Sequence, residues 1–346
     1  MRHILARKAT FTSQTMTPTV SVIIPNYNYA RYLPERIESV LKQTYRDFEV
    51  IILDDLSTDN SLEVIRRYQD MDERIVDVVV SSENSGSPFV QWEKGLSRAR
   101  GKYAWIAEAD DVADPDFLRY MVAAMEADSD VAVARAMSRL IDSNGGPHPM
   151  KSLEEDAADG CTYIYDGTEY LRCRMLQWNR CYNASMMLFS MDAWRALKSK
   201  SYMKLRYVGD WQFWGELMFG HKIADVRRQL SSFRLHGSSV TDGSKKTPRL
   251  NAESEIISYR FRKMLPELSP GMHIVHRYLI YRKYIRDHTH DYEREFRNID
   301  SEFWKSEGVS RLSYPLLWLY KHTFWLIEKR MVKTRQASLK PLAVIR

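Results

Sequence analysis

The stretch Val20–Tyr27, VSVIIPNY, is a run of mostly β-branched side chains that ends in a proline and two polar residues. A second stretch, Phe48–Asp55, FEVIILDD, has the same layout, an apolar run followed by an acidic pair. Apolar runs of this length predict strands that are buried on both faces, as the strands of parallel sheets are. The two stretches therefore indicate inner strands of an α/β domain.

Helical segments separate these strands from further ones. Pro34 can open a helix, because proline tolerates the first turn, and Asn60 with Glu63 forms a capping-box pattern. Strands are also expected at 75–80, 103–107 and 131–134, with helices at 87–100 and 115–125. This alternation predicts an α/β fold with a mostly parallel central sheet flanked by helices.

Polar residues come directly after four of these strands. They are Asn26-Tyr27, Asp54-Asp55, Asn84-Ser85-Gly86 and Glu108-Ala109-Asp110-Asp111. The carboxyl ends of parallel strands share one edge of a sheet, and ligands bind outside that edge. We therefore expect a binding site there.

The rest of the chain divides at about residue 247. Residues 145–166 are polar and predict a loop or lid, followed by a helix at 168–175, a strand at 185–189 and an aromatic helix at 210–218. We expect a flexible N-terminal tail at 1–17, an α/β domain at 18–246 and a helical, basic C-terminal extension at 247–346.

Charge, cysteine content and hydropathy indicate the cellular compartment. Residues 311–346 hold eight Lys or Arg and one Glu, so they account for the net charge of +6. Cys161, Cys173 and Cys181 form no C-x-x-C pair, which favours a reduced, intracellular setting. The first residues hold no long apolar region, and no apolar stretch is long enough to span a membrane. We expect a cytoplasmic protein.

Several enzyme classes lack their motifs here. The chain has no G-x-G-x-x-G after the first strand, no G-x-x-x-x-G-K-[ST] and no G-x-S-x-G. The acidic group 108–111 instead offers hard oxygen ligands for Mg²⁺ or Mn²⁺, unless it is a solvated turn in which Asp114 caps the next helix. The acidic pair 54–55 can accept hydrogen bonds from a base or a ribose, while Asp59 or Asn60 caps a helix.

Five segments together resemble family 2 glycosyltransferases, over roughly residues 20–244. They are VSVIIPNYNYARYLPERIESVLKQTY, FEVIILDDLSTDNSLEVI, GLSRARGKYAWIAEADD, YVGDWQFW and FRLHGSSVT. The resemblance implies a GT-A type nucleotide-binding fold and the transfer of a sugar from a nucleotide-sugar. Each segment alone is a weak signal, but five in the family's order are specific.

The resemblance also implies roles for individual residues. Donor binding falls to Pro25, Asn26, Tyr27, Asp54, Asp55, Asn84, Glu108 and Ala109, with Asp55 as the preferred contact to the base. Asp110 matches the metal ligand of the family's D-x-D motif, and His236 matches a position that reaches the metal or the diphosphate. Asp210 matches the catalytic base. Glu108 departs from the usual Asp, because it carries the carboxylate on a side chain that is one methylene longer.

Each of these residues also has a structural alternative. Asp210 can cap the helix at 211–218, and His236 can be an ordinary loop histidine. Trp211 is a core residue or stacks on an acceptor sugar, and Asn183 opens a polar turn or contacts the acceptor.

The segment 312–327, LSYPLLWLYKHTFWLI, predicts an interfacial helix whose basic neighbours face anionic lipid. The alternative is a helix that packs on the α/β domain or on a second subunit, as in a homodimer. No nucleic-acid-binding fold accompanies the charge, so no nucleic acid is expected.

The combined expectation is an inverting glycosyltransferase that depends on Mn²⁺ or Mg²⁺. It would use a UDP- or dTDP-sugar and a glycan or lipid-linked acceptor in the synthesis of a surface polysaccharide such as O-antigen or capsule. It would lie in the cytoplasm, with a peripheral position on the inner membrane face left open. The alternatives are a non-catalytic nucleotide-sugar-binding or assembly subunit of the same fold and, last, a nucleotidyltransferase.

Overall fold

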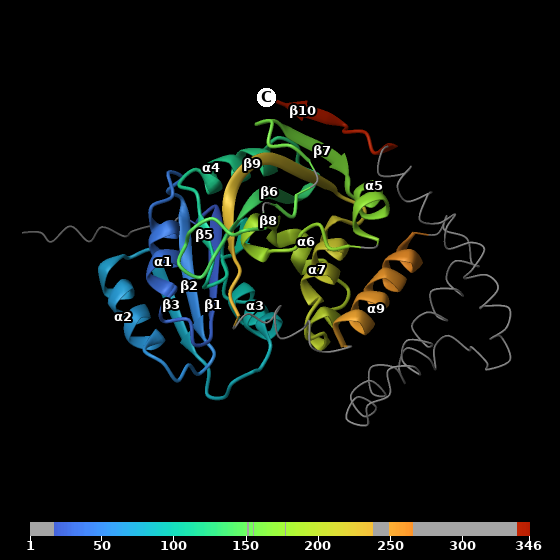
Figure 1. Cartoon of the computed structure of the whole chain (residues 1–346). Coiled ribbons are helices and arrows are strands. Elements are labelled where there is room, and N and C mark those ends of the chain that lie inside the picture. Colours follow the sequence, from blue (N-terminus) through green and yellow to red (C-terminus); the bar gives the residue numbers. More distant parts are fainter. Residues whose placement is uncertain (1–16, 151, 155, 177, 238–248, 266–337) are drawn as a thin grey trace, which may run out of the picture.

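The structure is a computed structural model that describes residues 17–150, 152–154, 156–176, 178–237, 249–265 and 338–346. One sheet runs through the molecule, and helices cover both of its faces (Figure 1). The order of its strands is β10-β7-β9-β6-β8-β4-β1-β2-β3, with β5 paired to β9.

The first half of the sheet has the predicted strand–helix alternation. Its elements are β1 Val20–Asn26, α1 Leu33–Leu41, β2 Phe48–Asp54, α2 Ser61–Met71, β3 Ile75–Val80, α3 Pro88–Leu96 and β4 Tyr103–Ile106. The pairs β1–β2, β1–β4 and β2–β3 are all parallel, which confirms the predicted arrangement here. Pro34 lies in the first turn of α1, as expected.

The second half of the sheet is mixed. Its elements are β5 Val112–Ala113, α4 Phe117–Glu126, β6 Val131–Ile141, β7 Thr162–Asp166, α5 Gly167–Tyr170, the π-helix η1 Leu171–Met175, the 3₁₀-helix η2 Ala184–Met186, β8 Met187–Ser190, α6 Met191–Arg195, the 3₁₀-helix η3 Ser201–Lys204, α7 Gly209–Met218 and β9 Lys222–Arg234. Only β6–β9 is parallel here, whereas β8 runs antiparallel to both β4 and β6, and β7 runs antiparallel to β9. Strand β7 lies inside the segment expected to be a loop.

Alternate residues of β1 face different cores. Ile23 packs into one apolar cluster, while Val22 and Ile24 pack into another, and all three are fully buried. The first cluster contains side chains of α3, α7 and α9, and the second contains side chains of α1, α2 and α4. Burial on both faces explains why β1 reads as a continuous apolar run.

Two described elements belong to the expected C-terminal extension. Helix α9 Arg249–Met264 packs on α7, and its Ile257 and Phe261 are fully buried in the core. Strand β10 Ala343–Ile345 adds to the edge of the sheet beside β7, which the expectation of a helical extension does not include. Residues 1–16 of the N-terminal tail and the segment 312–327 lie outside the described residues. No described helix has the length and hydropathy that crossing a membrane requires.

Candidate active site

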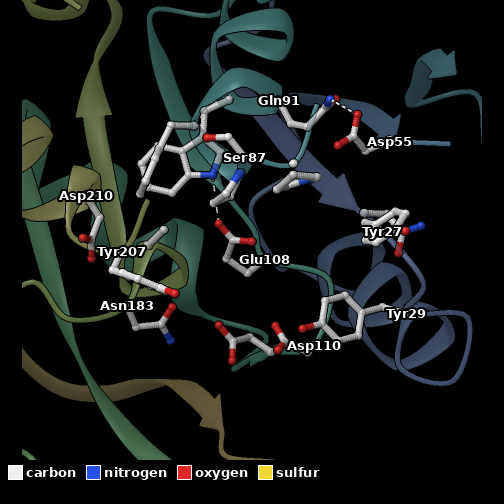
Figure 2. A pocket seen from close by; sticks show the side chains of 18 of the residues that line it. Tyr27, Tyr29, Asp55, Ser87, Gln91, Glu108, Asp110, Asn183, Tyr207 and Asp210 are labelled. Carbon is white, nitrogen blue, oxygen red and sulfur yellow. Dashed lines mark hydrogen bonds between the residues drawn. The ribbon is translucent and has the colours of Figure 1, made fainter. Parts of the chain in front are cut away.

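A cavity of about 450 Å³ opens at the carboxyl ends of β1, β2 and β4, as the strand-end argument predicts. Figure 2 shows Glu108 in the middle of this cavity, with Tyr27 and Asp55 on one side and Asp210 on the other. Side chains that are far apart in the sequence therefore line one compartment.

Asp55 is fixed in place on the side of β2. Its carboxylate accepts hydrogen bonds from the Ser85 backbone N–H at 2.9 Å, from Ser85 Oγ at 2.7 Å and from Gln91 Nε2. Asn84 shapes the same loop, because its Oδ1 accepts from the Gly86 N–H and its Nδ2 donates to the Asp55 carbonyl. The structure thus brings Asp55 and Asn84 together in the cavity lining.

The expected base contacts after β1 are also in the cavity lining. Pro25, Asn26 and Tyr27 line it, and Tyr27 presents an aromatic ring that is 45% exposed. Asp54 does not line it: this buried carboxylate accepts from Asn26 Nδ2 at 2.8 Å and from the Ser57 N–H at 2.9 Å. Asp54 therefore organises the loop, while Asp55 faces the cavity.

The acidic turn after β4 places three carboxylates, those of Glu108, Asp110 and Asp111, in the cavity lining. Glu108 accepts a hydrogen bond from Trp92 Nε1 at 2.9 Å, and Asp110 Oδ2 lies 2.9 Å from His236 Nε2. Burial and the neighbouring Asp110 carboxylate raise the pKa of Glu108 to about 8, and the same causes raise the pKa of Asp111 to about 6. Ala109 is buried and does not line the cavity.

Two buried arginines hold the backbone of this acidic turn. Arg36 donates through Nε to the Glu108 carbonyl at 2.8 Å and through Nη2 to Ser185 Oγ at 2.7 Å. Arg234 donates through Nε to the Asp110 carbonyl at 2.6 Å, and its backbone N–H donates to Asp111 Oδ1. The turn therefore has a fixed shape and partly compensated charge.

The donor set suits a magnesium or manganese ion. Among the described residues no three His, Cys, Asp or Glu side chains form a metal site by themselves. Mg²⁺ is usually held by one or two carboxylates together with substrate phosphates, and Asp110 supplies one such carboxylate in the cavity lining, 2.9 Å from His236 Nε2. Asp111 Oδ2, buried without a hydrogen-bond donor among the described residues, adds negative charge that a cation would offset.

Asp210 lies across the cavity, in the first turn of α7. Its Oδ1 accepts from the Trp211 N–H at 2.7 Å, and its Oδ2 accepts from Asn179 Nδ2 at 2.8 Å. Burial raises the pKa of Asp210 to about 7. The preceding Gly209 is required by close packing, because a Cβ there would lie 2.6 Å from both the Phe89 ring and the Tyr202 carbonyl oxygen.

Aromatic residues form the wall beside Asp210. Tyr182, Asn183 and Tyr207 line the cavity, and Figure 2 shows Tyr207 between Asp210 and Asn183. Tyr182 donates to Glu154 Oε1 at 3.0 Å, which fastens the segment expected to be a lid. Trp211 points into the core instead, where its Nε1 donates to the Met175 carbonyl.

A buried carboxylate of α9 supports the same wall. Glu253 accepts the backbone N–H of Arg206 at 2.9 Å and that of Tyr207 at 2.8 Å. Arg206 is the only Lys or Arg among the described residues that line the cavity. Helix α9 therefore helps to shape the site.

Comparison with known proteins agrees with this geometry. The family model described as Glycosyl transferase family 2 matches residues 21–196, and the chain belongs to this family. An uncharacterized glycosyltransferase of Nostoc sp. (strain PCC 7120) is 28% identical over 315 residues, which cover 85% of this chain and 87% of the relative.

Two more matches extend the comparison. A poly(ribitol-phosphate) beta-glucosyltransferase of Bacillus spizizenii is 31% identical over 40% of this chain and 22% of its own length. The crystal structure of S. aureus TarS 1-349 in complex with UDP-GlcNAc superposes with a TM-score of 0.61 over 92% of each chain. At 15% identity this structure shows the shared fold, which confirms the GT-A expectation.

Several residues of the site were not found from the sequence. Arg36 left a signal, because an arginine three residues after Leu33 and four before Val40 falls on the apolar face of its helix. Five other residues gave no signal in the sequence, because they reach the cavity or its wall only through the tertiary fold. They are Trp92, Asn179, Tyr182, Arg206 and Glu253.

Proposed function

We propose that the chain is a metal-dependent, inverting glycosyltransferase that transfers a sugar from a UDP- or dTDP-sugar to a hydroxyl group of a glycan or lipid-linked acceptor. The observation that carries this proposal is the placement of Asp210, a carboxylate with a pKa of about 7, in the same cavity as Asp110, whose Oδ2 lies 2.9 Å from Nε2 of the buried His236. A general base works best when its pKa lies near the operating pH.

The donor would bind on the side of β1 and β2. Tyr27 offers a ring for the base, and Asp55 offers a fixed carboxylate for an imide N–H or for ribose hydroxyls. Asp110 and His236 would hold the divalent ion, which when bound neutralises charge on the departing nucleoside diphosphate. Glu108 is already bound to Trp92, so we assign it a structural part in shaping the cavity.

The acceptor would enter along the wall of Tyr182, Asn183 and Tyr207. Asp210 takes the proton of the acceptor hydroxyl while that oxygen bonds to the anomeric carbon from the face opposite the diphosphate. The bond between the anomeric carbon and the diphosphate oxygen breaks in the same step, which inverts the configuration. Holding both substrates in one cavity supplies much of the rate acceleration.

We further propose a role in the synthesis of a cell-surface polysaccharide. The relative from Bacillus spizizenii is a poly(ribitol-phosphate) beta-glucosyltransferase, and TarS was crystallised with UDP-GlcNAc. Arg206 suits a negatively charged part of the acceptor or donor, because it is a cation in a cavity lined otherwise by carboxylates and neutral groups.

Calorimetric titration of nucleoside diphosphates, with and without Mn²⁺, tests the donor site. We expect binding of UDP or dTDP that requires Mn²⁺, is lost in Asp110→Ala and is kept in Asp192→Ala, which removes a carboxylate that is 88% exposed on α6. Absence of metal-dependent binding to every nucleotide, in a folded protein, would overturn the proposal.

Turnover assays then separate the alternatives. Release of nucleoside diphosphate that stops in Asp210→Asn, with donor affinity kept, supports the inverting transferase. Donor binding without turnover across a broad acceptor panel indicates a non-catalytic subunit. Release of pyrophosphate indicates a nucleotidyltransferase.

A further inference from the structure

Asn179 reaches Asp210 from the turn after η1. Its Nδ2 donates to Asp210 Oδ2 at 2.8 Å, although Asn179 itself does not line the cavity. We propose that Asn179 is a positioning residue that keeps the carboxylate of Asp210 ionised and in a fixed orientation. This inference rests on the proposed function, because it concerns the group assigned there as the base.

The orientation of the Asn179 amide is set by its own turn. Its Oδ1 accepts the backbone N–H of Cys181 at 3.0 Å, so Nδ2 is the atom left to face Asp210. The neighbouring Arg180 N–H donates to Met175 Sδ, which closes the turn onto η1. Turning the amide over would break the bond to Cys181 and leave that N–H without its acceptor.

This fixed orientation makes the contact selective for one protonation state. An amide N–H stabilises a carboxylate, but it cannot accept the proton of a carboxylic acid. The Oδ1 of Asp210 is held in turn by the Trp211 N–H at 2.7 Å. Two donors from separate segments therefore fix both oxygens and oppose the desolvation that raises the pKa of this group.

The other groups around Asp210 do not replace Asn179. Burial raises the pKa of the nearby Cys181 thiol to about 12, so it is neutral at physiological pH. Arg206 and Tyr207 come from the segment before α7, and Glu108 lies across the cavity. Among the described residues no Lys, Arg or His side chain is bonded to the Asp210 carboxylate.

The direct test is the pKa of Asp210, measured by ¹³C NMR of the carboxyl carbons, with the signal assigned by its loss in Asp210→Asn. A hydrogen bond to a charged group is strong enough that Asn179→Ala should raise this pKa by about one to two units. Asn179→Asp should raise it further, because two carboxylates then face each other. Trp178→Ala is the control, because Trp178 precedes Asn179 in the sequence and is itself 65% exposed. This variant should leave the pKa of Asp210 unchanged.

The pH dependence of sugar transfer is the second readout. In Asn179→Ala the acidic limb of the rate profile should move up with the pKa, so activity falls about tenfold per unit below it and recovers at alkaline pH. An equal loss at every pH, with the Asp210 pKa unmoved, would show a merely structural role and refute the proposal. If Asn179→Ala shifts the pKa of Asp210 but Asp210→Asn transfers sugar normally, Asn179 positions Asp210 as proposed, but Asp210 is not the general base.

Discussion

Asp210→Asn replaces a buried carboxylate by a neutral amide of nearly the same shape. The stability of this variant therefore measures what burial of the carboxylate costs, apart from its proposed catalytic function. The folded pKa of about 7 lies above the unfolded value of about 3.9. Between these pH values the folded chain keeps a proton that the unfolded chain has lost. The unfolding free energy of the native protein therefore decreases as pH rises from about 4 to about 7.

The variant has no charge to desolvate, and its Oδ1 can still accept the Trp211 N–H. Its Nδ2 then faces the Nδ2 donor of Asn179, which adds a cost that does not depend on pH. At 1.36 kcal/mol per pKa unit, loss of the ionisation penalty should favour the variant by about 2.7 kcal/mol more at pH 8.5 than at pH 5. Urea unfolding of both proteins at the two pH values measures this difference, and Asp192→Asn serves as the exposed control. An equal effect at both pH values would refute the assignment of a desolvated carboxylate.

Three further variants test the supports of the site. Arg36→Met should lower the unfolding free energy by about 3 kcal/mol or more, because the acidic turn loses a buried cation; Lys42→Met, 70% exposed beside α1, should be neutral in the same urea titration. Gly209→Ala should lower the unfolding free energy by about 1–3 kcal/mol and slow sugar transfer, because the added Cβ has no room. The control is Gly237→Ala, whose Cβ points into open space, and equal melting temperatures for the two variants would contradict this prediction. Glu253→Ala should lower the unfolding free energy by about 2 kcal/mol, because two backbone N–H groups lose the carboxylate to which they donate. It should also raise the KM for the acceptor substrate more than the KM for the donor. Steady-state kinetics in which both KM values change equally would argue against a role of Glu253 on the acceptor side of the cavity.

The sequence was sufficient to predict those features that depend on a local pattern of residues. Residues of β1 and β2 are buried on both faces, so their apolar runs give their positions closely. Asp55, Asn84, Glu108 and Asp110 lie just beyond strand ends, and a parallel arrangement must bring such residues to one edge. The mixed second half of the sheet gave a weaker signal, because β7 lies in a polar segment and β10 is a short exposed strand.

The sequence by itself determined the α/β class, the edge of the sheet at which the cavity opens and the residue types offered there, since these depend on strand periodicity and on the residues directly after each strand. Only the tertiary structure decided which acid of the pair 54–55 faces the cavity, that Trp211 packs inward, and that Arg36 and Arg234 lie beneath the acidic turn. It also decided that Asn179 and Glu253 support the wall around Asp210. The physical reason is that these properties depend on burial and on hydrogen bonds between residues that lie 28 to more than 120 positions apart, and no local spacing encodes such pairings.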